Sequence, residues 1–172
     1  MIGPLSLVSQ VCADAMIEAA SSTPVGCLVE VGVYKGGTAF LLHDLAQRQQ
    51  RKLYLYDTFT GIPWKSLVDV HDIGEFSDTS VESVQRCCPQ AIVCAGIFPA
   101  SAVEMGPVAF AHLDCDQYRS YQESIEYLSP RMVPGGIIWF DDSTQLYGAR
   151  LAVMEHFGER VKLHKGKHYV EF

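Results

Sequence analysis

Hydrophobic residues fall into short apolar runs that alternate with amphipathic stretches of helical period. The apolar runs are rich in valine, leucine, isoleucine and tyrosine, which is typical of buried strands. The stretches between them place apolar residues three or four positions apart, as helices with one buried face do. The pattern predicts strands at 25–33, 53–56, 91–95, 108–113 and 137–140, with one or two closing strands within 161–172. It predicts helices at 7–20, 38–50, 80–88, 118–128 and 147–157.

Strands that alternate with helices predict a doubly wound α/β fold with a mainly parallel, Rossmann-like sheet. With two closing strands this sheet has seven strands. The 172 residues contain no linker, repeat or low-complexity tract, so residues 1–172 are expected to form a single domain. In such folds ligands bind at the carboxyl ends of the strands. Candidate functional residues are therefore sought where strands end.

Composition narrows the possible partners. The net charge of −7 and a pI of about 5.3 argue against nucleic acid as a partner. No apolar run reaches the roughly 18–20 residues that span a bilayer, and no basic segment of a signal peptide precedes an apolar one. The six cysteines show neither a CxxC pair nor zinc-ligand spacing, which favours reduced thiols and a cytoplasmic protein. Cys115 lies between two acids that keep its thiol protonated, so a nucleophilic role is not expected.

A glycine-rich turn follows the first predicted strand. Gly32, Gly36 and Gly37 separate the apolar run from a helix that begins near Thr38. Glycines let the backbone approach a ligand closely, and the start of a helix offers free N–H groups. The turn lacks the second glycine of the GxGxxG fingerprint, which favours S-adenosylmethionine (SAM) over NAD. Simple turn geometry is the alternative for these glycines.

Two acids flank this turn in the predicted fold. Asp57 ends the second strand, 27 residues after Glu30, where a carboxylate suits the two ribose hydroxyls of an adenosine-containing cofactor. An ordinary helix or loop cap is the alternative. Glu30 is interpreted as a neighbour of a cationic ligand, which SAM is.

A second acidic group gathers at the ends of two later strands. Asp114 and Asp116 follow the fourth predicted strand, and Asp141 and Asp142 follow the fifth. Carboxylates at adjacent strand ends repel each other unless a cation binds or some take up protons. Mg²⁺ satisfies such a set and can lower the pKa of a substrate hydroxyl. A solvated acid or a helix cap is the alternative for Asp116 and Asp142, and His112 is expected to be a hydrogen-bonded core residue.

Several other residues have more than one possible role. His71 lies in the long 58–76 segment between two acids and is a candidate for contact with substrate. Trp64 and Phe76, in the same segment, either stack on a ligand or pack as part of a lid. Tyr118 and Tyr121 are interpreted as packing residues of the helix they share.

Six segments in order resemble the macrocin O-methyltransferase (TylF-like) family. They are EVGVYKGGT (30–38), YDTFTGIP (56–63), GEFS (74–77), GIFP (96–99), HLDCDQY (112–118) and PGGIIWFDD (134–142). The resemblance covers about residues 24–158. It implies a class I, SAM-dependent and Mg²⁺-dependent O-methyltransferase of sugar hydroxyls, with a small molecule or glycan as acceptor.

The resemblance also implies roles for individual residues. Asp116 would be the general base that removes the hydroxyl proton, and Asp114, Asp141 and Asp142 would hold Mg²⁺. SAM would contact Glu30, Gly32, Tyr34, Gly36, Gly37, Thr38, Asp57, Ser77, Gly96 and Asp114. Transfer would be a direct displacement at the methyl carbon, in which proximity and orientation carry most of the rate.

Two departures from the family pattern concern the acceptor. About 24 residues precede the first predicted strand, fewer than in the family, so the acceptor pocket is expected to be open or completed by another subunit of a homo-oligomer. Ser143 follows the Asp pair where the family has an aromatic residue. A different sugar, a catechol-like phenol and a surface glycan therefore stay open as acceptors. Two other functions stay open: a non-catalytic SAM-binding subunit, and an NAD(P)-linked reductase, which the missing GxGxxG and the absent Tyr-x-x-x-Lys pair disfavour.

Overall fold

A computed structural model describes residues 7–172. The strands are β1 (Cys27–Val31), β2 (Leu53–Asp57), β3 (Ile92–Ala95), β4 (Val108–Leu113), β5 (Met132–Phe140), β6 (Lys162–His164) and β7 (Lys167–Glu171). The α-helices are α1 (Gln10–Ser22), α2 (Gly37–Arg48), α3 (Val81–Cys87), α4 (Tyr118–Leu128) and α5 (Tyr147–Phe157). Within this range no helix is both long and apolar enough to cross a membrane.

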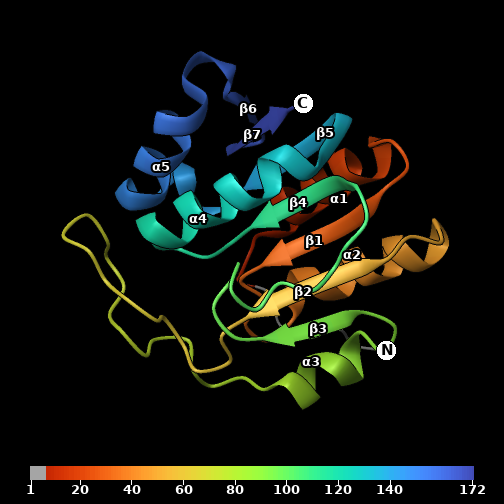
Figure 1. The fold of residues 1–172 in the computed structure, drawn as a ribbon, viewed down its shortest axis with the longest axis horizontal. Helices are drawn as coiled ribbons and strands as arrows, with labels where there is room; N and C mark the ends of the chain where they lie inside the picture. The colour runs from red at the N-terminus through yellow and green to blue at the C-terminus, as the bar shows by residue number, and fades with distance from the viewer. Residues whose placement is uncertain (1–6) are drawn as a thin grey trace.

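The strands form one seven-stranded sheet in the order β3-β2-β1-β4-β5-β7-β6. The first five of these are parallel to one another, and β7 runs antiparallel to both β5 and β6. The predicted doubly wound, mainly parallel sheet is therefore confirmed. Chain order reverses between β1 and β4, and such a switch point is where ligands bind in open α/β sheets. Figure 1 shows the arrowheads of β1 to β4 ending on one side of the molecule.

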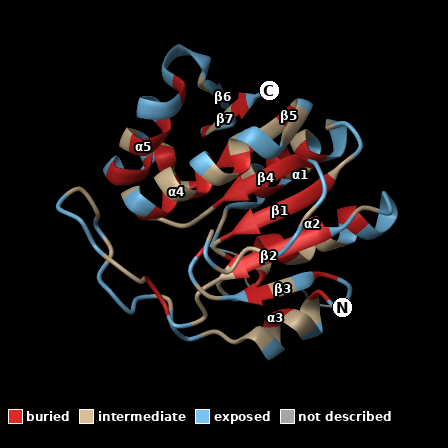
Figure 2. Cartoon of the chain, viewed as in Figure 1, coloured by how far each residue is buried: buried red, intermediate tan, exposed pale blue. Residues whose placement is uncertain are grey.

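Strand alternation divides the core into two layers. Val29 of β1 packs with apolar residues of α4 and α5 on one face, whereas Leu28 packs with α1 and α2 on the other. Successive side chains of a strand point to opposite faces, so a strand covered on both sides is apolar throughout. Figure 2 shows the central strands buried along their length between the helices.

The structure corrects several predicted boundaries. The first helix begins at Gln10 rather than at residue 7, because the Ser9 hydroxyl accepts a hydrogen bond from the Cys12 N–H and caps it there. The fifth strand begins at Met132, five residues before its predicted start. Gly135 takes a φ of +79° within it, a conformation open to glycine, so the strand continues through the Pro-Gly-Gly segment.

The segment 58–80, here called the 58–80 loop, joins β2 to α3 from the carboxyl side of the sheet (Figure 1). The Asp69 carboxylate accepts hydrogen bonds from the Ser66 N–H and hydroxyl and, at 2.7 Å, from the Tyr118 N–H at the start of α4. The Trp64 indole donates to the Ser120 hydroxyl of the same helix, and Arg119 lies over its ring. The loop is thus fastened to the first turn of α4.

Gly148 of α5 makes this docking possible, because a Cβ there would lie 2.4 Å from Asp69 Oδ1. We expect Gly148→Ala to displace Asp69 and release the loop, at a cost of about 1–3 kcal/mol. Limited proteolysis should then cut within 58–80 faster than in the natural chain. Gly106→Ala is the matched control, since nothing lies within 4 Å of that Cβ position. Equal cleavage rates in both variants would contradict the prediction.

Candidate active site

The glycine-rich turn lies at the switch point, directly after β1. Gly32 has a φ of +87°, and a Cβ there would lie 1.8 Å from the carbonyl oxygen of Asp114. Gly36, with a φ of +85°, precedes the first residue of α2. The turn therefore brings the backbone of β1 against the end of β4, and the free N–H groups of α2 begin beside it.

Asp57 holds this turn in shape. Its Oδ2 accepts hydrogen bonds of 2.8 Å from the N–H groups of Val33 and Tyr34, and its Oδ1 accepts one from the Phe59 N–H. A carboxylate oxygen can accept more than one hydrogen bond. Asp57 also lines the cavity described below, so ribose contact and loop support are compatible roles.

Glu30 lies behind the cavity rather than in its wall. It is fully buried, and its Oε1 accepts a 2.6 Å hydrogen bond from the Thr38 hydroxyl and lies 2.8 Å from His112 Nδ1. Alternation along β1 explains this, because Glu30 shares the α2 face with Leu28. Glu30 thus tethers the first turn of α2 to β4. His112 is the hydrogen-bonded core residue expected from its position.

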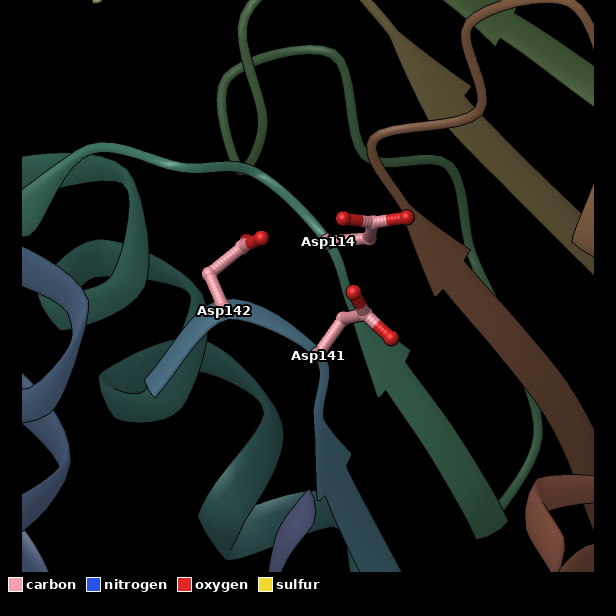
Figure 3. Close-up of side chains that lie close together, drawn as sticks. All are labelled: Asp114, Asp141 and Asp142. Atoms are coloured by element: carbon pink, nitrogen blue, oxygen red, sulfur yellow. The ribbon is translucent and has the colours of Figure 1, made fainter. Parts of the chain in front are cut away.

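The acids after β4 and β5 converge, as their places at adjacent strand ends predict. Asp114, Asp141 and Asp142 each present a carboxylate oxygen, and these atoms lie within 4.8 Å of one another. Figure 3 shows the three side chains around one space, Asp114 from one strand end and the Asp pair from the next. Oxygen ligands in this number suit a hard divalent cation.

The electrostatics of this group are unfavourable without a cation. Burial raises the pKa of Asp114 well above the usual carboxyl range, and Asp142 and Asp141 raise it further. Burial and then Asp141 raise the pKa of Asp142 to about 6. Burial, Asp142 and Asp141 raise the pKa of Asp116 to about 8. Carboxylates in this arrangement bind protons or a cation.

Lys167 of β7 also lies at the site, and no motif in the sequence predicted its contact with Asp141. Its Nζ donates to Asp141 Oδ2 at 2.7 Å and to the Asp141 carbonyl at 2.8 Å, and it is buried. Burial opposes ionisation of Asp141, but His112 and Lys167 together hold its pKa below the usual value. Burial likewise opposes a charge on His112, yet its contacts with Asp141 and Glu30 raise its pKa to about 10. The other oxygen, Asp141 Oδ1, lies 3.9 Å from His112 Nε2.

Tyr121 contributes more than the packing expected of it. Its hydroxyl oxygen lies 2.8 Å from the Leu113 carbonyl oxygen and 3.0 Å from Asp142 Oδ2, and it accepts a hydrogen bond from the Asp142 N–H. These contacts fix the position of Asp142. Tyr118 instead bonds Glu155 at the surface. Asp116 has a φ of +57°, and its N–H donates to Asp142 Oδ2. The helix-cap alternative for Asp116 does not hold, because Gln117 is the N-cap of α4 and Asp69 bonds the free N–H of Tyr118.

A cavity of about 310 Å³ joins these features. Its wall includes the predicted site residues Gly32, Tyr34, Gly37, Thr38, Asp57, Gly96, Asp114, Asp116, Asp141 and Asp142. Glu30, Gly36 and Ser77 are not part of the wall, and Ser77 is exposed. His71 and Phe76 of the 58–80 loop do line it, whereas Trp64 packs on α4. The sequence-predicted residues thus gather around one cavity, with three exceptions.

Thiol chemistry is not favoured at the cavity. Burial raises the pKa of Cys115 well above its ordinary value, and the carboxylates of Asp142, Asp116 and Asp114 raise it further. The thiol is therefore protonated near neutral pH, as its acidic neighbours in the sequence predict.

Solved structures define the class of fold. The O-methyltransferase NovP superposes with a TM-score of 0.84 at 20% identity, covering 96% of this chain and 81% of NovP. CalS11, a calicheamicin methyltransferase, superposes with a TM-score of 0.76 at 21% identity, covering 94% of this chain and 77% of CalS11. An apo structure of CalS11 describes it as a TDP-rhamnose 3'-O-methyltransferase. The fold is that of the class I methyltransferases.

The sequence places the chain more narrowly. The profile of the macrocin-O-methyltransferase (TylF) family matches residues 1–168, and the chain belongs to this family. A curated relative from Streptomyces olivaceus is 27% identical over 153 residues. It is the 8-demethyl-8-(2,3-dimethoxy-alpha-L-rhamnosyl)-tetracenomycin-C 4'-O-methyltransferase. The match covers 77% of this chain and 58% of that relative, so the chain spans less than two thirds of its length.

Proposed function

We propose that the chain is a SAM-dependent O-methyltransferase that methylates a hydroxyl of a sugar, with a 6-deoxyhexose such as rhamnose as the favoured acceptor. One observation carries the proposal: the three carboxylates of Asp114, Asp141 and Asp142 line the same cavity as the glycine-rich turn. Family membership and the rhamnose chemistry of the S. olivaceus relative and of CalS11 support it. A phenol is the second class of acceptor that such a site could take.

The residues fit Mg²⁺ as well as SAM. Asp114, Asp141 and Asp142 would hold the cation, since each keeps an oxygen free of the contacts made with Lys167, Tyr121 and the Asp116 N–H. The raised pKa values of Asp114 and Asp142 support this assignment, because a bound cation would favour the ionised form of both carboxyls. When bound, Mg²⁺ would supply positive charge that favours loss of the acceptor's hydroxyl proton.

The chain's own residues then have distinct tasks. The turn 32–38 and Asp57 bind and orient SAM, whose sulfonium carries the methyl group. Asp116, in the cavity wall two residues after Asp114, removes the hydroxyl proton of the acceptor. SAM, when bound, would supply the methyl group to the acceptor oxygen, and its sulfur would keep the electron pair of the broken carbon–sulfur bond. Phe76 and the rest of the 58–80 loop limit access of water.

A methyl-transfer assay tests the proposal. The full chain, SAM and Mg²⁺ are mixed with TDP-L-rhamnose, methyl α-L-rhamnopyranoside or catechol, and products are measured by mass spectrometry. We expect a singly methylated rhamnoside whose formation stops in EDTA. If S-adenosylhomocysteine (SAH) binds but no acceptor is methylated, a non-catalytic SAM-binding subunit is the better interpretation. Binding of NAD⁺ in place of SAH would favour the reductase.

Without a bound metal, the free energy of unfolding of the chain should fall as pH rises. A carboxyl whose pKa is higher in the folded state favours folding while protonated and opposes it once ionised. Asp142 and Asp116, with pKa values of about 6 and about 8, should therefore destabilise the folded chain progressively as pH rises from about 4 through about 8. His112, whose pKa is raised from 6.5 to about 10, adds a loss of the same sign as pH rises from about 6.5 to about 10.

Mg²⁺ should reverse that loss. It competes with protons for the same oxygens, so its stabilisation is expected to be large near pH 9 and small near pH 5. At about 100 times its Kd, the cation should add about 2.7 kcal/mol, a rise in Tm of roughly 5–10 °C. Thermal unfolding at both pH values measures this. The Asp142→Asn variant should lose this rise in Tm. The control is Asp44→Asn, which changes an exposed acid on α2 and should keep the rise. Equal rises in Tm at both pH values would contradict the expectation.

A further inference from the structure

One side chain of the cavity wall, His71, has no role in the reaction described above. His71 of the 58–80 loop lines the cavity, and its Nδ1 lies 2.8 Å from Glu75 Oε2. On the other side of the ring, His71 Nε2 lies 3.7 Å from Asp116 Oδ1. The imidazole thus stands between an exposed carboxylate and the proposed general base.

Local contacts fix the pair in this arrangement. Glu75 Oε1 accepts a 2.7 Å hydrogen bond from the Asp72 N–H, which holds the carboxylate toward His71. The Phe76 ring and the imidazole pack edge to face, with the ring centroids 5.0 Å apart. Gln117 Nε2 donates to the His71 carbonyl at 3.2 Å. The ring is therefore supported from its own loop, and its backbone is tied to the start of α4.

Glu75 determines which nitrogen of His71 carries a proton. A carboxylate beside Nδ1 favours the tautomer with Nδ1 protonated, which leaves the lone pair of Nε2 toward Asp116. The separation of 3.7 Å is longer than a hydrogen bond, and a small closure of the loop or one water would connect the two atoms. Asp116 is 19% exposed and His71 is 26% exposed, so a route from base to histidine leads outward to solvent.

We propose that His71, oriented by Glu75, is a positioning residue for Asp116 that carries the acceptor's proton from Asp116 to solvent. The inference rests on the proposed methyl transfer. The proton leaves the acceptor hydroxyl for Asp116, moves to His71 Nε2 and passes from the imidazolium to water, while Glu75 stabilises the positive charge. The acceptor oxygen gains the methyl group, so each transfer releases one proton and no redox partner is needed.

Steady-state methyl transfer to TDP-L-rhamnose tests this role. His71→Gln should lower kcat by about 10- to 100-fold with the KM for SAM changed less than about twofold. Glu75→Gln should give a smaller loss, because the histidine remains. His43→Gln, a histidine on α2 that contacts Gln90 away from the cavity, is the matched control and should keep the natural rate.

Chemical rescue separates proton transfer from support of the loop. In His71→Gly, added imidazole should restore part of the rate if the ring carries the proton. A rate within twofold of the natural one in His71→Gln would overturn the proposal. A loss that imidazole does not relieve, accompanied by a higher KM for SAM, would assign His71 a structural role and would also overturn it.

A measurement without acceptor keeps this inference distinct from the proposed function. Long-range ¹⁵N–¹H spectra of the full chain should show His71 protonated on Nδ1, and its Nε2 signal should shift in Asp116→Asn but not in Asp44→Asn. If the natural chain methylates no rhamnoside, the proposed function fails for these acceptors while this spectrum still tests the pairing. An Nε2 signal unchanged by Asp116→Asn would overturn the inference.

Discussion

Asp116→Asn should lower the rate of methyl transfer by about 10²- to 10⁴-fold while SAH still binds. The amide cannot remove a proton, and loss of a general base has costs of this size. Asparagine tolerates the φ of +57° found at this position, so the backbone should keep its course. The rate is measured under single-turnover conditions, and the affinity for SAH by calorimetry.

The result is specific only if another acid behaves differently. Asp44→Asn removes an exposed carboxylate of α2 that pairs with Arg48, and it should keep both rate and affinity. An Asp116→Asn enzyme with at least half the natural rate would show that another group removes the proton. A variant that loses SAH binding as well would place Asp116 in cofactor binding instead.

The second large effect is expected at Gly32. A Cβ at this position would lie 1.8 Å from the Asp114 carbonyl oxygen and 2.5 Å from its carbonyl carbon, and neither backbone atom can move without separating β1 from β4. Gly32→Ala should therefore lower the free energy of unfolding by about 3–5 kcal/mol, the sum of overpacking and a left-handed φ. Urea unfolding measures the change, and the same displacement of Asp114 should weaken Mg²⁺ binding.

Gly74 provides a matched control for the clash. It has the same φ of +87°, but nothing lies within 4 Å of its Cβ position. Gly74→Ala should therefore cost only about 1 kcal/mol, the conformational penalty without the clash. If the two variants lose similar amounts of stability, close approach of the two strands is not what requires glycine at position 32.

The architecture could be read from the sequence because local pattern and topology agree. The segment 108–113 is apolar except for His112, and it forms a strand with these bounds, buried on both faces. The helices 118–128 and 147–157 also match their predicted bounds. The start of β5 could not be predicted, because a proline and two glycines suggest a turn, and only the pairing of Met132 with Val108 of β4 shows that the strand begins there.

The sequence predicted those parts of the site that depend only on where each strand ends. Asp114 and Asp141 converge because parallel neighbours end at the same edge of the sheet. Glu30 was expected to face the ligand, but it stands one residue before the end of β1, where alternation turns its side chain to α2. Alternate residues of a strand point to the same face, so Glu30 could have been assigned from the sequence to the same face as Leu28.

Other partners come from distant segments that no spacing rule connects. Lys167 reaches Asp141 because β7 pairs antiparallel with β5. Asp69 reaches the first turn of α4 only because the 58–80 loop folds back over it. Pairing of this kind depends on the tertiary fold, since a lone lysine or aspartate in the sequence resembles any other surface charge.

The most direct test of the proposed site is a crystal structure of the full chain with SAH and Mg²⁺ near pH 8. We predict SAH against the turn 32–38 and Asp57, and a cation in contact with Asp114, Asp141 and Asp142. Electron density for SAH in another part of the molecule, or three carboxylates without a cation at millimolar Mg²⁺, would contradict the proposed site.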